Sequence, residues 1–243
     1  MIWWGLAGFT GGAIIGSFVA TLVIRWPRGR NTGGRSACDS CSVRLRWFEL
    51  VPLFSCLVQR GKCRRCAAPI STEHFAIESV CAIVGATALL ADPGFGGIAG
   101  ACFGWLLVAL AGLDFRNFWL PDRLTFLLGI TGFATGALGL VPALADRLIG
   151  GAAGFGTLAI IAWSYARVRH RQGMGAGDPK LLGAIGLWLG WQTLPFVLLG
   201  ASVLGLCLSL AMLARKQTVT GETRLPLGAL MAVAAFPIWI FSR

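Results

Sequence analysis

Two aspartates in a largely apolar chain are the residues best placed to do chemistry. Asp114 follows one long apolar run, and Asp178 stands in the segment Gly175-Ala176-Gly177-Asp178 just before another. Neighbouring carboxylates share a proton, because their like charges disfavour double ionisation. One can then take a proton from water while the other protonates a carbonyl oxygen or a leaving amine. Such a pair could hydrolyse a peptide bond at the edge of a membrane.

The residues around Asp178 add to this interpretation. Gly175 and Gly177 carry no side chain, so a substrate backbone can approach the carboxylate. Glycine also adopts positive φ values that other residues avoid. Lys180 completes the candidate active-site motif.

Helix capping is the main alternative to catalysis. Asp178 could be the N-cap of a helix with Pro179 in its first position, and Asp122 fits a capping role even better. The residues alone leave both interpretations open. A Ser/His or Cys/His hydrolase is unsupported, because His74 and His170 have no Ser or Cys partner in a motif.

Four cysteines form a second constellation, suited to a metal ion. Cys38 and Cys41, and then Cys63 and Cys66, are each separated by two residues, close to the spacing of zinc ribbons. Four thiolates give structural zinc a closed tetrahedral shell. Disulfides are disfavoured in a reducing cytoplasmic loop, and a redox role is the other alternative. No chemistry is assigned to the remaining cysteines, Cys56, Cys81, Cys102 and Cys207.

The composition places these residues in a membrane protein. Of the 243 residues, 56% are hydrophobic and only 13% are charged, which is too apolar for one soluble core. We expect an all-α polytopic protein, because backbone polar groups in lipid must be satisfied within helices. Eight apolar runs approach the roughly 20 residues that cross a bilayer. They cover residues 2–24, 75–91, 94–113, 124–140, 148–166, 181–190, 194–214 and 225–241, and the sixth is short and glycine-rich.

The spacing of these runs divides the chain into three parts. Residues 1–24 form the first transmembrane helix, 25–73 a small cytoplasmic insert, and 74–243 a seven-helix membrane domain with both aspartates. An insert this short rarely folds by core burial alone and usually needs a metal or disulfides. The cysteine pairs therefore predict a zinc-ribbon-like domain between the first two helices.

The basic residues predict the orientation. Eight spans put 19 of the 21 Lys and Arg residues on one side, with only Arg147 and Arg243 on the other. By the positive-inside rule the first side is cytoplasmic and both termini lie outside. The insert, Asp114 and Asp178 then face the cytoplasm. The net charge of +11 fits this topology and contact with the anionic headgroups of the lipid bilayer, and no nucleic-acid partner is expected.

Several short motifs follow one another in a fixed order. Gly16-Ser17-Phe18 and Arg25-Trp26-Pro27 open the chain, followed by the two cysteine pairs, by Asp114 with Pro121-Asp122, and by Gly175-Ala176-Gly177-Asp178-Pro179-Lys180. Together they resemble the type IV prepilin peptidases, which are intramembrane aspartic proteases of the GxGD class, over nearly the whole chain. The resemblance implies that Asp114 and Asp178 are catalytic, that Cys38, Cys41, Cys63 and Cys66 bind zinc, and that Asp122 belongs to a neighbouring motif.

The resemblance also implies a reaction. Such enzymes, in the bacterial inner membrane, remove the short basic leader from prepilins or pseudopilins at the cytoplasmic face, and cut after a Gly. Bacterial members commonly also methylate the new N-terminus with S-adenosylmethionine, although no residue here identifies a methyl-donor pocket. Two positions depart from the family pattern: Ala20 stands where Asn is usual, and Pro179 where an ordinary residue is common.

Other interpretations remain at this stage. The chain could be a peptidase without methyltransferase activity, or a non-catalytic zinc-bearing membrane scaffold of a secretion or DNA-uptake system. A transporter is less well supported, because no broken helix marks a site at mid-membrane depth. A basic leader approaching a basic face needs acidic groups, so we hypothesise that Glu49 or Glu78 recruits it. The sequence specifies neither the particular pilin substrate nor the oligomeric state.

Overall fold

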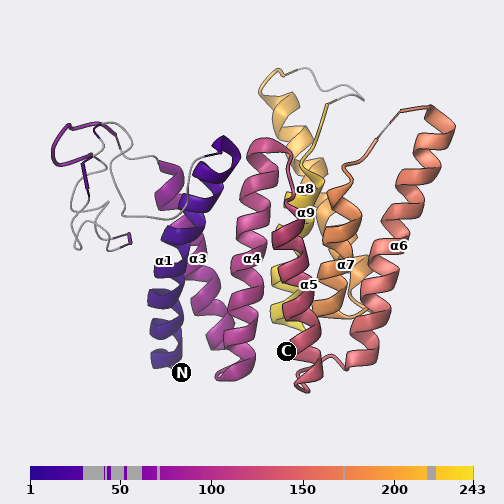
Figure 1. Ribbon diagram of the computed structural model, residues 1–243, viewed down its shortest axis with the longest axis horizontal. Coiled ribbons are helices and arrows are strands. Elements are labelled where there is room, and N and C mark those ends of the chain that lie inside the picture. The colour runs from indigo at the N-terminus through magenta and orange to yellow at the C-terminus, as the bar shows by residue number, and fades with distance from the viewer. Residues whose placement is uncertain are drawn as a thin grey trace. The chain divides into compact units, whose positions relative to one another are not determined.

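The computed structural model describes residues 1–29, 41, 43–44, 52–53, 62–69, 72–171, 173–217 and 223–242. Within these residues it contains eight α-helices, a short 3-10 helix and no strand beyond an isolated bridge between Lys62 and Pro69 (Figure 1). The expected all-α class is confirmed. The helices are α1 (Ile2–Arg25), η1 (Trp26–Arg28), α3 (Thr72–Ala91), α4 (Phe95–Asn117), α5 (Asp122–Ala137), α6 (Leu144–Arg169), α7 (Gly177–Leu189), α8 (Leu194–Ala214) and α9 (Leu227–Phe241).

Each predicted apolar run corresponds to one α-helix. In the described part of the chain, five helices are long and apolar enough to cross a membrane: α1, α3, α4, α6 and α8. The other three are shorter, and α7 has only 13 residues. At 1.5 Å per residue α7 rises about 20 Å, less than the roughly 30 Å of hydrocarbon in a bilayer. Several passes through the membrane are thus confirmed.

The chain forms two compact units, Met1–Ala109 and Leu110–Arg243. The first unit holds α1, α3, most of α4 and the described cysteines of the insert. The second holds the end of α4 and helices α5 to α9. Asp114 and Asp178 therefore belong to the same unit, which also contains α7 and α9.

Glycines allow α1 and α3 to pack closely within the first unit. Gly8, Gly12 and Gly16 recur once per turn on one face of α1. A methyl group on Gly8 would collide with the carbonyl oxygen of Gly85, and one on Gly12 with that of Cys81. Small residues at such spacing bring helix backbones together in a bilayer, where dispersion contacts rather than hydrophobic burial hold helices in place.

Helix α7 is enclosed by its neighbours in the second unit. It packs against α5, α6 and α9 (Figure 1), and most of its residues are buried. The backbones of α6 and α7 meet at Gly150 and Gly186, and Trp188 Nε1 donates to the Leu128 carbonyl of α5 at 2.8 Å. These protein contacts explain how so short a helix is accommodated.

Arg147 is buried rather than placed at the membrane surface. Its side chain is 0% exposed, although the basic-residue pattern assigned it to the outer side of the membrane. Its Nη1 atom donates to the carbonyls of Gly132 in α5, at 2.9 Å, and Leu187 in α7, at 3.1 Å, and Nη2 donates to Val141 at 2.8 Å. Leu187 lies in the last turn of α7, where carbonyls lack intrahelical donors and carry partial negative charge, so this guanidinium joins the end of α7 to α5 and to the loop that follows α5.

Candidate active site and metal site

Asp114 lies in the last turn of α4 and is 5% exposed. The helix ends at Asn117, and the next residue, Phe118, has a φ of 49° and donates its N–H to the Asp114 main-chain carbonyl at 2.8 Å. The carboxylate accepts a hydrogen bond from outside its own helix, because Ala229 N–H donates to Asp114 Oδ2 at 2.8 Å. The last helix, α9, therefore holds the first aspartate.

Asp178 lies in the first turn of α7 and is 7% exposed. Its Oδ2 atom accepts the N–H of Gly175 at 3.1 Å. The N-cap position is occupied by Ala176, and no side chain caps this helix. The capping interpretation of Asp178 is wrong for this reason, since the residue stands inside the helix.

The two aspartates meet at the start of α9. The main-chain N–H of Gly228 lies near enough to both carboxylates to favour their ionised forms, and the two carboxylates are close enough to interact electrostatically. Residues far apart in the sequence are thus brought to one point by three helix ends. A buried carboxylate pair of this kind can supply both a general base and a general acid. Sequence reasoning missed Gly228 and Ala229, whose only signal is Pro226 at the start of the last apolar run.

The glycines beside Asp178 are explained by the lack of room for a side chain and not by their backbone conformation. Neither Gly175 nor Gly177 is among the residues with positive φ, so the expectation of positive φ is wrong. A methyl group on Gly177 would lie 2.8 Å from Leu120 Cβ, and one on Gly175 would lie 3.2 Å from Asp178 Oδ2. Leu120, in the loop between α4 and α5, occupies the space that Gly177 leaves.

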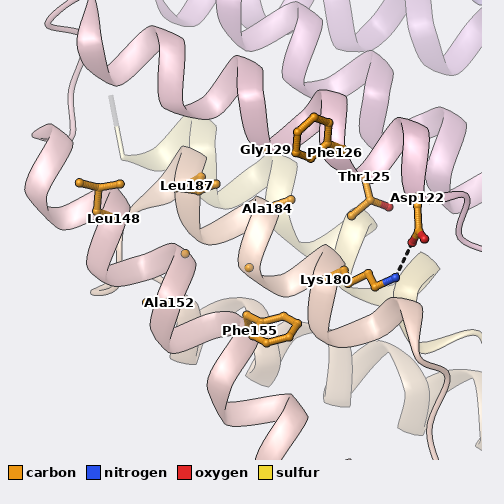
Figure 2. Close-up of a pocket in the computed structure, with 12 residues that line it drawn as sticks. Asp122, Thr125, Phe126, Gly129, Leu148, Ala152, Phe155, Lys180, Ala184 and Leu187 are labelled. Atoms are coloured by element: carbon orange, nitrogen blue, oxygen red, sulfur yellow. Dashed lines mark hydrogen bonds and ion pairs between the residues drawn. The ribbon is translucent and has the colours of Figure 1, made fainter.

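Lys180 pairs with Asp122 and not with either candidate catalytic aspartate. Its Nζ atom lies 2.7 Å from Asp122 Oδ1, which joins the first turns of α5 and α7. Asp122 follows the N-cap residue Pro121, and no side chain caps α5, so its expected capping role is also wrong. Figure 2 shows the pair at one end of a largely apolar groove of about 630 Å³ between α5, α6 and α7, which neither Asp114 nor Asp178 lines.

Three cysteines of the predicted zinc motif lie together in the first unit. The thiol sulfurs of Cys41, Cys63 and Cys66 are within 4.8 Å of one another, and Cys38 lies outside the described residues. A tight turn presents the second pair, because Ala67 N–H donates to the Cys63 carbonyl at 2.9 Å. Zn–S bonds of about 2.3 Å in a tetrahedron separate sulfurs by roughly 4 Å. The three thiols therefore fit a metal ion.

Glu78 has a structural partner at the base of the insert. It is 8% exposed, and its Oε2 atom accepts the N–H of Leu53 at 2.9 Å. This contact ties the insert to α3 and argues against a role for Glu78 in recruiting a leader. Glu49, the other residue in that hypothesis, lies outside the described residues.

The fold and the site define a multi-pass membrane protein with a buried carboxylate pair and a cysteine cluster. Two family models match consecutive parts of the chain: the Bacterial Peptidase A24 N-terminal domain at residues 10–91 and the Type IV leader peptidase family at residues 101–210. The chain belongs to the type IV leader peptidase family and is an enzyme of that family. A search of solved structures found no significant match.

Similar proteins cover most of the chain. A prepilin leader peptidase/N-methyltransferase of Aeromonas hydrophila is 37% identical over 203 residues, which are 83% of this chain and 70% of that protein. Proteins of the same name from Stutzerimonas stutzeri and Pseudomonas aeruginosa are each 36% identical, over 83% of this chain and 70% and 69% of their own length. The Type IV leader peptidase match includes both aspartates but ends before α9.

Proposed function

We propose that this chain is an aspartic endopeptidase that removes the short basic leader of type IV prepilins or pseudopilins. Asp114 and Asp178 are its catalytic residues. Gly175 and Gly177 leave room beside Asp178, and Lys180 acts only indirectly, because its ion pair with Asp122 joins the first turns of α5 and α7. The observation that carries the proposal is that two buried carboxylates from different helices lie close enough to interact at the first turn of α9, where Ala229 N–H donates to Asp114 Oδ2. The names of the relatives are consistent with this substrate class.

The mechanism follows from a carboxylate pair that shares one proton. The ionised carboxylate takes a proton from water, and the resulting hydroxide attacks the carbonyl carbon of the scissile peptide bond. The protonated carboxylate gives its proton to the carbonyl oxygen, which forms a tetrahedral diol. The other carboxylate then passes the proton it took from water to the leaving amine as the C–N bond breaks, and a diol hydroxyl returns a proton to the first carboxylate as the new carboxyl group forms. Leu120 and the surrounding helix ends keep the pair largely out of bulk water, which strengthens each electrostatic interaction.

The proposed setting is a bacterial inner membrane, with both termini outside and the insert of residues 25–73 in the cytoplasm. The distribution of basic residues supports this orientation. Asp114 at the end of α4 and Asp178 at the start of α7 would then face the cytoplasm, where the leader of a prepilin lies. The membrane part would correspond to residues 74–243.

A second activity, N-methylation of the new N-terminus with S-adenosylmethionine, is favoured by the names of the relatives. No described residue identifies a site for this methyl donor. Structural zinc, held by Cys38, Cys41, Cys63 and Cys66, would stabilise the insert. The zinc would act by cross-linking the two cysteine pairs.

Aspartate substitutions test the peptidase proposal. Asp114→Asn and Asp178→Asn are nearly isosteric and remove the general base or acid, so each should lower leader removal at least about 100-fold. The assay uses purified enzyme in lipid vesicles and a model prepilin with a basic leader. Mass spectrometry of the product also measures methylation of the new N-terminus.

Two outcomes would change this conclusion. Normal leader removal by either variant would contradict the carboxylate-pair mechanism and favour a non-catalytic scaffold. If the wild-type enzyme removes the leader in the presence of S-adenosylmethionine but the product gains no methyl mass, the chain is a peptidase without methyltransferase activity.

A further inference from the structure

The first turn of α9 touches both proposed catalytic residues. Ala229 N–H donates to Asp114 Oδ2 at 2.8 Å, and the Gly228 main chain lies near enough to both carboxylates to stabilise their negative charge. The first hydrogen bond within α9 runs from Leu230 N–H to the Pro226 carbonyl. The N–H groups of Gly228 and Ala229 therefore precede the helical ladder and have no carbonyl of their own helix to bond.

The position of Gly228 is sterically closed. A methyl group there would lie 2.7 Å from Leu120 Cδ1 and 3.0 Å from Asp114 Oδ2. Gly228 is not among the residues with positive φ, so the backbone alone would accept other residues. Glycine within a helix costs about 1 kcal/mol relative to alanine. The closeness of Asp114 explains why glycine stands here despite this cost, since any side chain at residue 228 would push the carboxylate away.

The negative charge of Asp114 is also stabilised by α9. Asp114 stands at the C-terminal end of α4, where the partial negative charge of the helix disfavours an anion. The N-terminus of α9 carries partial positive charge and meets the same carboxylate. The N-terminus of α9 thereby offsets the unfavourable interaction between Asp114 and the C-terminus of α4, and it stabilises the negative charge of the carboxylate pair.

We propose that the first turn of α9 is a third component of the catalytic site and that Gly228 is a positioning residue. The Ala229 N–H holds the Asp114 carboxylate, and the missing side chain of Gly228 leaves it room to approach Asp178, so that both carboxylates reach one water molecule and one peptide bond. This inference rests on the proposed function, because the carboxylates are its reacting groups. It extends the site beyond residue 210, where the Type IV leader peptidase match ends.

Gly228→Ala tests the steric part of the proposal. Displacement of a carboxylate by about 1 Å should lower kcat for the model prepilin 10- to 100-fold and leave KM nearly unchanged. Two matched variants are the controls. Gly156→Ala, where a methyl group meets nothing within 4 Å, should keep kcat and thermal stability. Gly200→Ala, where it meets Ala234 Cβ at 3.0 Å, should disturb α8–α9 packing and thermal stability but not kcat.

A double substitution separates positioning from simple crowding. Gly228→Ala could lower kcat only because its methyl group collides with Leu120. In that case the double variant Gly228→Ala/Leu120→Ala will have the same kcat as Leu120→Ala alone, and the proposal is overturned. If the methyl group displaces Asp114, the low kcat persists.

Ala229→Pro is the second test and does not depend on that clash. It removes the N–H that bonds Asp114, at a first-turn position where proline is tolerated, and should also lower kcat. Unchanged kcat in both Gly228→Ala and Ala229→Pro, while Asp114→Asn is inactive, would refute the role of α9 and leave the peptidase proposal standing. Activity in Asp114→Asn and Asp178→Asn would refute the peptidase proposal itself.

Discussion

Burial distinguishes the three aspartates near the candidate active site. Asp114 and Asp178 are 5% and 7% exposed, and their carboxylates are bonded by main-chain N–H groups. The side chain of Asp122 is 73% exposed and forms an ion pair with Lys180, which is 46% exposed. Charges interact strongly in a buried, low-dielectric site and weakly at a surface. The buried pair is therefore the one suited to proton transfer.

Asp122→Asn should have only a small effect. An exposed ion pair contributes at most about 1 kcal/mol, so we expect leader removal to fall by less than about fivefold and thermal stability to change little. The measurement is the model prepilin assay, beside thermal unfolding followed by tryptophan fluorescence. Asp178→Asn, with the same chemical change, is the matched comparison. A loss in Asp122→Asn as large as in Asp178→Asn would place Asp122 among the catalytic groups.

At the scale of elements, the sequence predicted the helices better than it predicted their ends. An apolar run marks only the part of a helix that lipid or protein surrounds. The main-chain hydrogen bonds of the helix continue into the polar residues on either side, so the helix is longer than the run. Helix α7 accordingly starts at Gly177 and not at residue 181, and α4 continues past Asp114 to Asn117. The meeting of Asp114 and Asp178 could be predicted from the number of spans, because that number puts the end of one span near the start of the other.

The role of α9 could not be predicted in the same way. Main-chain N–H groups hold the carboxylates, and every non-proline residue has one, so no residue type marks this contact. Gly228 stands in an apolar run that contains other small residues. Only the position of the helix start, which depends on tertiary packing, distinguishes it.

Arg147 should be important for the packing of α5, α6 and α7. Its guanidinium bonds carbonyls of α5, of the end of α7 and of the loop between α5 and α6. Arg147→Met keeps much of the volume but takes this donor from the Leu187 carbonyl, and an unpaired buried acceptor costs about 1 to 3 kcal/mol. The Gly132 carbonyl keeps the Thr135 hydroxyl as a donor. We expect a marked loss of thermal stability in detergent micelles. Arg147→Lys, which keeps the charge without the planar fork of donors, should lie in between.

The other end of the same helix offers a control for this prediction. Arg167 is exposed, and its guanidinium stacks over Trp163 at 5.1 Å, which stabilises by about 0.5 to 1 kcal/mol at a surface. Arg167→Met should accordingly have a small effect on the unfolding temperature. Equal effects of the two substitutions would contradict the structural role of Arg147.

At the scale of the whole molecule, the two candidate sites belong to different units. Cys41, Cys63 and Cys66 lie within Met1–Ala109 and both aspartates within Leu110–Arg243. The two family matches divide the chain near the same point, at residues 10–91 and 101–210. Each unit has its own internal packing, so damage to the insert need not reach the carboxylate pair.

Metal loss should therefore affect the insert more than peptide cleavage. Cys63→Ser and Cys66→Ser each remove a ligand, and because metal binding contributes folding free energy to so small a domain, the insert should lose both zinc and protection from proteases. Leader removal should persist, since Asp114 and Asp178 keep their contacts. Metal content by mass spectrometry, limited proteolysis and the prepilin assay measure the three effects.

Cys102→Ser is the control, because this thiol lies in α4 outside the zinc motif. It should leave metal content at about one zinc per chain, the stoichiometry of a four-thiolate site. If methylation fails in Cys63→Ser while cleavage continues, the second activity depends on the insert. If cleavage stops with zinc loss, as completely as in Asp178→Asn, the insert must also contribute to the peptidase reaction, and the separation of the two sites is wrong.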